Sequence, residues 1–188
     1  MEKGKAVIVC APSGTGKSTI IDSLRERGID FYFSVSATSR PPRGDEQEGK
    51  EYYFKSQEEF ERLIAEDAFI EYEEVYSDQK YGTLKSEVEK RIEAGINIIF
   101  DVDIHGGLRI KEYLGDRSLS LFILPPSIEA LRERLINRKT ETLEKIETRL
   151  ARAKYEISRA NEFDRQLVND DLAKAKDEAY KIVSEFFG

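Results

Sequence analysis

The sequence is poor in cysteine and tryptophan and has no long apolar run. Cys10 is the one cysteine among 188 residues, so no disulfide can form within the chain. A chain without disulfides fits a reducing compartment, and we therefore expect a cytoplasmic protein. The apolar run near the N-terminus is too short for a signal peptide or a membrane span, and no later run approaches eighteen apolar residues. We therefore expect no membrane partner.

Positive charge is also in short supply. The chain has 30 lysines and arginines against 37 aspartates and glutamates, giving a formal net charge of -7 at pH 7. A protein that binds nucleic acid non-specifically needs a basic face, so this balance argues against a nucleic-acid partner. Small anionic ligands remain possible, because a few clustered arginines can outweigh the net charge. The length and the lack of repeats or linkers favour a single domain over residues 1–188.

What the chain does have is an alternation of apolar strands with amphipathic helices. Strand patterns occupy 5–10, 96–103, 118–126 and 165–170, with further strand-like runs between 31 and 55. Helical patterns occupy 18–28, 56–67, 86–95, 127–138, 143–161 and 172–187. Ser56 followed by Glu59 predicts a capping box for the second of these helices. We therefore expect an α/β fold, with a parallel sheet and helices on both faces.

The segment APSGTGKST, residues 11–19, nearly fits the phosphate-binding pattern G-x-x-x-x-G-K-[ST], with Ala11 in place of the first glycine. A glycine-rich turn with an incidental lysine is the alternative, but the position between a strand and a helix favours a phosphate loop. Gly14 and Gly16 allow backbone amides to face a phosphate, Lys17 adds a positive charge, and the Ser18 hydroxyl is suited to Mg²⁺. The predicted triphosphate site comprises Ala11, Pro12, Ser13, Gly14, Thr15, Gly16, Lys17, Ser18 and Thr19.

Several further segments carry a resemblance to a known family. SVSATSRPPRGDEQEGKEYYF, EDAFIEYEEV, KYGTL, IIFDVDIHGG and LVNDDL, together with the phosphate loop, resemble guanylate kinases over nearly the whole chain. The resemblance implies a P-loop NTPase-type fold with nucleoside-monophosphate-kinase architecture, ATP as donor, GMP as acceptor, and ADP and GDP as products. We also expect dGMP as an acceptor and Mg²⁺ as the cofactor that accompanies ATP. The resemblance also implies three parts: a core (1–35, 92–125 and 152–188), a GMP-binding segment (36–91) and a lid (126–151). Either a monomer or a homodimer fits the sequence.

The acceptor phosphate is a small dianion, which planar bidentate donors suit best. Arg40 and Arg43 lie in a proline-bracketed loop that directs both toward one target. Ser36, Tyr52 and Tyr81 can add hydroxyl groups, and the resemblance implies that all five hold the phosphate. From the residues alone, an exposed charged loop beside core tyrosines is an equal alternative.

Guanine presents a ring N–H beside an amine, and one carboxylate can accept from both. The resemblance assigns this role to Glu71 with help from Thr83, whereas the residues alone leave Glu71 as one of several solvated acids. Asp101 and Asp103 alternate in a predicted strand, so we expect both on one face near the phosphate loop. The resemblance places Asp103 on the acceptor nucleotide and Asp101 beside Mg²⁺, water and base.

Arginines dominate the predicted lid. Arg134 and Arg138 are one helical turn apart, and Arg149 and Arg152 share a face of the next helix. By resemblance, lid closure brings arginines onto the transferring phosphoryl group, and we select Arg138 and Arg149, then Arg134, as catalytic together with Lys17. A solvated charged face is the alternative for any one of them.

Two polar positions lie outside these groups. Asn169, at the end of the last strand, lies beside the donor adenine by resemblance, although Asn169 or Asp170 could equally cap the terminal helix. His105 is expected in a loop, without a catalytic role, because the acceptor phosphate is already a nucleophilic dianion.

Two other functions remain open. One is a non-catalytic guanylate-kinase-like module that binds proteins, which the retained Lys17 and Ser18 argue against. The other is a related kinase with a different acceptor, which Glu71, Tyr81 and Thr83 argue against.

Overall fold

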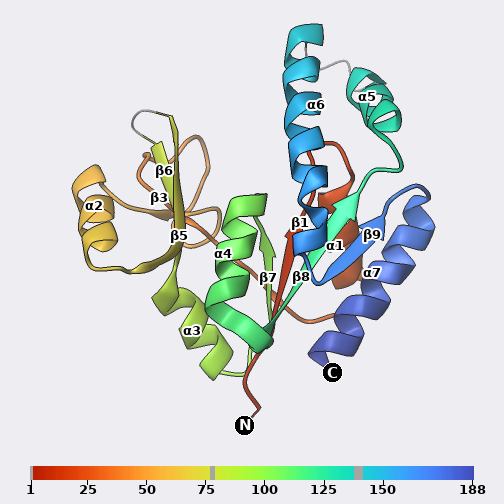
Figure 1. Cartoon of the computed structure of the whole chain (residues 1–188). Coiled ribbons are helices and arrows are strands. Elements are labelled where there is room, and N and C mark those ends of the chain that lie inside the picture. The colour runs from red at the N-terminus through yellow and green to blue at the C-terminus, as the bar shows by residue number, and fades with distance from the viewer. Residues whose placement is uncertain (1, 77–78, 138–141) are drawn as a thin grey trace.

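The computed structural model describes residues 2–76, 79–137 and 142–188. Its centre is a five-stranded sheet in the order β2-β7-β1-β8-β9, in which every pair is parallel (Figure 1). All five residues of β1 are buried, as expected for the middle strand of a parallel sheet. The strands are β1 (Ala6–Cys10), β2 (Tyr32–Phe33), β7 (Ile98–Asp101), β8 (Ser118–Leu124) and β9 (Arg165–Val168).

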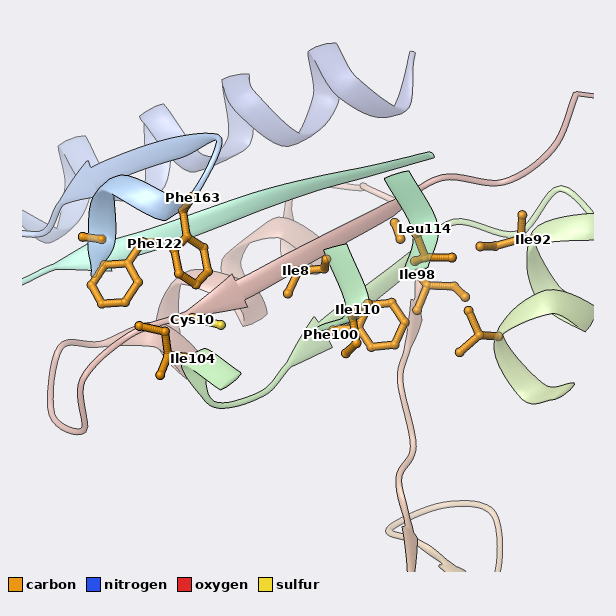
Figure 2. Close-up of a cluster of buried hydrophobic side chains, with 13 residues drawn as sticks. Ile8, Cys10, Ile92, Ile98, Phe100, Ile104, Ile110, Leu114, Phe122 and Phe163 are labelled. Carbon is orange, nitrogen blue, oxygen red and sulfur yellow. The ribbon is translucent and has the colours of Figure 1, made fainter. Parts of the chain in front are cut away.

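Helices cover both faces of this sheet, which confirms the predicted fold class. On one face α1 (Lys17–Glu26) and α7 (Leu172–Phe187) bury a cluster that includes Val7, Leu24 and Val183. On the other face α3 (Lys85–Glu93) and α4 (Ile104–Leu114) pack with strand residues into a second cluster. Figure 2 shows this cluster, whose labelled members are Ile8, Cys10, Ile92, Ile98, Phe100, Ile104, Ile110, Leu114, Phe122 and Phe163.

A smaller sheet of four strands stands beside the core, on the left in Figure 1. Helix α2 (Gln57–Ala65) packs on it through Phe60, whose ring stacks on Phe69 with centroids 4.5 Å apart. The predicted capping box is confirmed, since the Ser56 hydroxyl accepts from the Glu59 amide and the Glu59 carboxylate accepts from the Ser56 amide. The strand order is β4 (Tyr53–Phe54), β3 (Ala37–Thr38), β6 (Gln79–Leu84) and β5 (Phe69–Tyr76).

Two further helices, α5 (Ile128–Asn137) and α6 (Leu143–Ser158), pack against each other at the upper right of Figure 1. Their contact is a separate apolar cluster of Leu131, Leu135, Ile146, Leu150 and Ala153. Short 3-10 turns at Gly115–Arg117 and Ala160–Glu162 lead into β8 and β9. None of the helices seen in these described segments is long and apolar enough to cross a membrane.

The chain leaves β7 earlier than the sequence pattern suggests. The strand ends at Asp101, and Asp103 is the N-cap of α4, with its side chain accepting from the Gly106 amide at 2.8 Å. The prediction that both aspartates alternate along one strand was therefore wrong. His105 lies in the first turn of α4, so its prediction as a loop residue was also wrong.

The N-cap of α7 is Asp171, whose carboxylate accepts from the amides of Ala173 and Lys174. Asn169 and Asp170 do not have this capping role, so that alternative was wrong. Because a cap must immediately precede the first helical turn, the third polar residue in the run is the one placed to do this.

Candidate active site

The phosphate loop joins β1 to α1, and buried hydrogen bonds stabilise its conformation. Thr15 donates from its hydroxyl to the Pro12 carbonyl at 2.7 Å, and Asn169 donates from its side-chain amide to the Thr15 carbonyl at 2.7 Å. Gly14 and Gly16 have φ values of 88° and 93°, in the region that only glycine adopts at low cost. A Cβ on Gly16 would lie 2.6 Å from Nδ2 of Asn169, so this position also lacks room for a side chain.

Lys17, the first residue of α1, forms an ion pair with Asp101 at the carboxyl end of β7. Both side chains are about one-quarter exposed, at 21% and 25%, so a ligand can reach them. They face a cleft of about 650 Å³ lined by Ala11, Pro12, Ser13, Gly14, Thr15, Gly16, Lys17, Ser18, Thr19, Asp101, Val102, Asp103, Arg149, Arg152 and Glu156. The structure thus brings the whole predicted loop and both predicted aspartates to one cleft.

Two arginines from α6 also line this cleft. Arg149 donates to the Ser13 hydroxyl at 2.7 Å, which joins α6 to the phosphate loop. Arg152 donates to Glu156 at 2.9 Å, and another of its nitrogens lies 3.8 Å from the Asp103 carboxylate. Lys17 from the phosphate loop and two arginines from α6 therefore bring positive charge to the same cleft.

Another predicted lid arginine, Arg134, is placed differently. Arg134 donates to the backbone carbonyl of Asn169 at 2.9 Å, so it ties α5 to the end of β9 and is not among the residues that line the cleft. Arg138 lies outside the described residues.

Glu71 is directed toward the core by an irregularity in the β5–β6 hairpin. Phe69 pairs with Leu84 but Glu71 pairs with Thr83, so β5 has one more residue than β6 between these pairs. The resulting bulge leaves Phe69 packed against α2 and turns Glu71 to the opposite face, where its carboxylate accepts from the Thr83 hydroxyl at 2.6 Å.

The environment of Glu71 favours the neutral acid. Burial raises the pKa of its carboxyl group, the Thr83 hydrogen bond opposes this, and the nearby Asp103 carboxylate raises it further. A second cavity, of about 240 Å³, is lined by Glu71, Tyr72, Glu73, Asp103, His105, Gly106 and Arg109. Because Asp103 also lines the larger cleft, it connects the two spaces.

The predicted phosphate-binding residues of the second sheet form another cluster. Arg40, only 6% exposed, donates to the Tyr81 hydroxyl at 3.1 Å and stacks 4.9 Å from the Tyr52 ring centroid. Its two terminal nitrogens donate to the two oxygens of Glu46, at 2.7 and 2.8 Å. This pairing, with the Arg43 amide, lowers the pKa of Glu46 to about 2.

Arg43 and Ser36 lie at the edge of this cluster. The Arg43 guanidinium donates to the Gln79 side chain at 3.3 Å, and the Ser36 carbonyl accepts from the Tyr53 amide at 2.9 Å. The larger cleft is lined by neither of them, nor by Arg40, Tyr52 or Tyr81. The predicted phosphate-binding residues of the second sheet are thus assembled apart from the residues that line the larger cleft.

Sequence reasoning overlooked three charged residues that line these cavities, Glu73, Arg109 and Glu156, and also Glu46, which pairs with Arg40. Arg152 was predicted to share a helical face with Arg149 but was not selected as a site residue, although it lines the cleft. Arg109 and Glu73 were hidden because neither α4 nor the β5–β6 hairpin had been predicted. Glu46 gave no signal, since nothing local separates it from its acidic neighbours.

Comparison with known proteins agrees with this geometry. The family model described as Guanylate kinase matches residues 3–187. The chain is 55% identical over 186 residues to a guanylate kinase of Bacteroides fragilis, covering 99% of this chain and 91% of the relative. A guanylate kinase of Chlorobaculum tepidum is 44% identical over 186 residues, with 99% and 95% covered.

A solved structure gives the same result at the level of the fold. The crystal structure of guanylate kinase from Anaplasma phagocytophilum superimposes with a TM-score of 0.72 at 30% identity, covering 99% of this chain and 87% of that one. The phosphate loop, the Glu71–Thr83 pair and the match over nearly the full length lead to one assignment: this chain belongs to the guanylate kinase family, the nucleoside monophosphate kinases that act as ATP:GMP phosphotransferases.

Proposed function

We propose that this chain transfers the γ-phosphoryl group of ATP to GMP, and less efficiently to dGMP, giving ADP and GDP. The observation that carries the proposal is the position of Asp103, which lines both the phosphate-loop cleft and the cavity that contains Glu71. A donor bound in the first space and an acceptor bound in the second would therefore meet at this residue.

On the donor side, the triphosphate is bound by backbone N–H groups of the non-proline residues within 11–19, by the Lys17 ammonium group and by the N-terminus of α1. Asn169 supports this site indirectly, because it holds the Thr15 carbonyl at the base of the loop. Ser18 and Asp101 line the cleft with the oxygen donors that Mg²⁺ prefers. Those two residues would hold Mg²⁺, which neutralises phosphate charge during transfer.

The residues present suit a metal ion that arrives with the nucleotide. Across 2–76, 79–137 and 142–188, no group of three or more His, Cys, Asp or Glu side chains is arranged to hold a metal. Magnesium commonly takes one or two protein ligands and completes its shell with phosphate oxygens and water. A site of Ser18, Asp101 and the nucleotide fits that pattern.

On the acceptor side, Arg40 and Arg43 with the hydroxyls of Ser36, Tyr52 and Tyr81 bind the phosphate of GMP. Arg40 is already oriented by Glu46, Tyr81 and Tyr52, so little of its freedom has to be lost on binding. The ionised Glu71 carboxylate accepts from the ring N–H and the amine of guanine, with Thr83 beside it. Adenine presents a lone pair at that ring nitrogen, which the carboxylate repels.

Transfer is in line and needs no general base. The acceptor phosphate has a second pKa near 6, so most of it is a nucleophilic dianion at neutral pH. Lys17 and Arg149, with Arg138 and Arg134 as further candidates, stabilise charge on the phosphoryl group. We further propose that 36–91 and 126–151 move as acceptor-binding and lid segments against the remaining core, so that closure excludes water.

A coupled assay of ADP release with ATP, Mg²⁺ and GMP, dGMP, AMP or UMP tests the proposal. We expect GMP-dependent ADP release, weaker release with dGMP, and little with AMP or UMP. A folded chain that releases no ADP with any acceptor would contradict the proposal and favour a non-catalytic protein-binding module. A preference for AMP would instead contradict the assigned role of Glu71.

Lys17→Ala should lower kcat by about 10²- to 10³-fold, the size of effect seen when a charge-stabilising donor is removed. Lys3→Ala is the matched control, because Lys3 is an exposed lysine paired with Glu93 near the opposite end of the sheet. Circular dichroism should show both variants folded. Equal kcat values for the two variants would contradict the role of the loop lysine.

A further inference from the structure

Glu73 lies on the same face of the β5–β6 hairpin as the proposed base-reading residue Glu71. Side chains two residues apart on a strand point to one face, and no irregularity separates these two positions. Glu71 pairs across the hairpin with Thr83, and Glu73 pairs with Tyr81. The same face therefore carries two successive cross-strand pairs.

These pairs lead from the base site toward the phosphate site. The first pair contains the Glu71–Thr83 hydrogen bond of 2.6 Å. The second contains Tyr81, whose hydroxyl accepts from Arg40 at 3.1 Å. Glu73 is thus about 7 Å along the strand from Glu71, toward the residues assigned to the acceptor phosphate. In any nucleoside monophosphate the ribose joins base to phosphate, so the ribose must lie in this interval.

The groups around Glu73 suit a sugar hydroxyl. Glu73 lines the cavity of about 240 Å³ together with Glu71 and Asp103, and burial and the neighbouring Asp103 carboxyl group raise the pKa of Glu73. Arg152 and His105 are the neighbouring basic residues. Glu73 is itself exposed, so a ligand can reach its oxygens. Carboxylate oxygens only accept hydrogen bonds, and a ribose hydroxyl is a donor that can meet them.

We propose that Glu73 is a specificity-determining residue that accepts a hydrogen bond from the 2′-hydroxyl of the acceptor nucleotide. The 2′-carbon adjoins the carbon that bears the base, which suits a residue next along the strand from Glu71. GMP has this hydroxyl and dGMP lacks it, so Glu73 makes the chain prefer GMP. This inference rests on the proposed function, because it deepens the acceptor site assigned there.

The test compares kcat/KM for GMP and for dGMP in four proteins: wild type, Glu73→Ala, Glu73→Gln and Glu74→Ala. Glu74 is the matched control, an exposed glutamate on the opposite face of the same strand. A hydrogen bond to a charged group corresponds to a preference of about 10- to 100-fold. We expect wild type and Glu74→Ala to show that preference, and Glu73→Ala to bring the GMP/dGMP ratio within about threefold of one. Glu73→Gln retains an acceptor oxygen and should keep part of the preference.

Because dGMP cannot make the bond, its kcat/KM in Glu73→Ala should stay close to the wild-type value, which also shows that the variant folds. An unchanged GMP/dGMP ratio in Glu73→Ala, or no preference in wild type, would overturn the inference. Calorimetric binding of GMP and dGMP without ATP gives the same comparison of dissociation constants. If wild type shows no turnover, the proposed function fails, while the binding ratio still decides the role of Glu73.

Discussion

At the scale of single residues, guanine recognition and protein stability favour opposite charge states of Glu71. Its carboxyl group must be ionised to accept from guanine, yet burial raises its pKa and so favours the neutral acid. A carboxyl group whose pKa is raised by folding costs stability progressively as the pH rises from its unfolded pKa through its folded one. The free protein is therefore less stable at neutral pH than the same fold with a neutral group at this position.

Glu71→Gln should separate the two requirements. The variant keeps an oxygen for the Thr83 hydroxyl but has no charge, so its urea midpoint should exceed that of wild type at pH 8 and approach it toward pH 5. At the same time its preference for GMP over AMP should fall by about 10²-fold or more, because the neutral glutamine side chain does not repel the lone pair at the ring nitrogen of adenine.

Glu74→Gln is the control for this prediction, since it removes the same charge from an exposed position. Urea unfolding at pH 5 and pH 8 and kcat/KM for the two nucleotides are the measurements. An equal stability change in both variants would show that burial of Glu71 is not its cause.

At the scale of elements, α1 is flanked by two glycines with similar backbones and different surroundings. Gly16 before the helix has φ 93°, and Gly28 after it has φ 87°. A Cβ on Gly16 would meet Nδ2 of Asn169 at 2.6 Å, whereas one on Gly28 would meet nothing within 4 Å. An alanine would therefore strain the backbone at both positions, but only at Gly16 would its side chain also clash with a neighbouring residue.

Gly28→Ala should cost about 1–2 kcal/mol in the free energy of unfolding, the price of a left-handed conformation, and should leave ATP binding intact. Gly16→Ala should cost more and should abolish ATP binding. Urea unfolding and calorimetric titration with ATP measure the two effects. In the double variant Gly16→Ala/Asn169→Ala the stability losses should be less than additive, because removing the Asn169 side chain relieves the clash. Strict additivity would contradict that contact.

The elements predicted correctly from sequence are those with local determinants. The strand before the phosphate loop, the Ser56 capping box and the terminal helix each follow from a few adjacent residues. Helix α4 was not predicted because Gly106 and Gly107 lower helix propensity. Long-range packing explains the glycine at position 107, since a Cβ there would lie 2.6 Å from the Cys10 sulfur.

The site residues likewise divide into those with local sequence determinants and those that depend on contacts distant in sequence. Residues 11–19 were predicted as a unit because sequence neighbours form the loop. Glu71 could be singled out only by resemblance, since the bulge that turns it inward depends on pairing with β6. Likewise, the Arg40–Glu46 ion pair depends on how the intervening loop folds back.

At the scale of the whole molecule, contacts from three regions converge on the phosphate-loop cleft. The loop comes from the core, Arg149 reaches it from α6, and Asp103 connects it to the cavity beside the β5–β6 hairpin. A ligand that fills both spaces would contact all three regions at once.

We therefore expect a single compound that joins adenosine and guanosine through a phosphate chain to stabilise the fold more than ATP and GMP added together. Saturation at about 100 times the dissociation constant adds about 2.7 kcal/mol, or roughly 5–10 °C in Tm for a chain of this size. Thermal unfolding with each ligand measures the difference. Arg149→Ala should reduce the shift, and Arg132→Ala, at an exposed ion pair between α5 and α6, should not. Equal shifts for the joined and separate nucleotides would show that the two spaces are not bridged.

The lone thiol at the end of β1 has a practical consequence. Cys10 is 1% exposed, donates to the Asp103 carbonyl at 3.3 Å, and has a pKa raised mainly by burial, so an alkylating reagent cannot modify it in the closed fold. The rate at which this sulfur is labelled in native buffer would therefore measure how often the central strand opens. The same strand leads directly into the phosphate loop. Slower alkylation of the Cys10 sulfur in the presence of nucleotide would therefore indicate that the nucleotide occupies the loop.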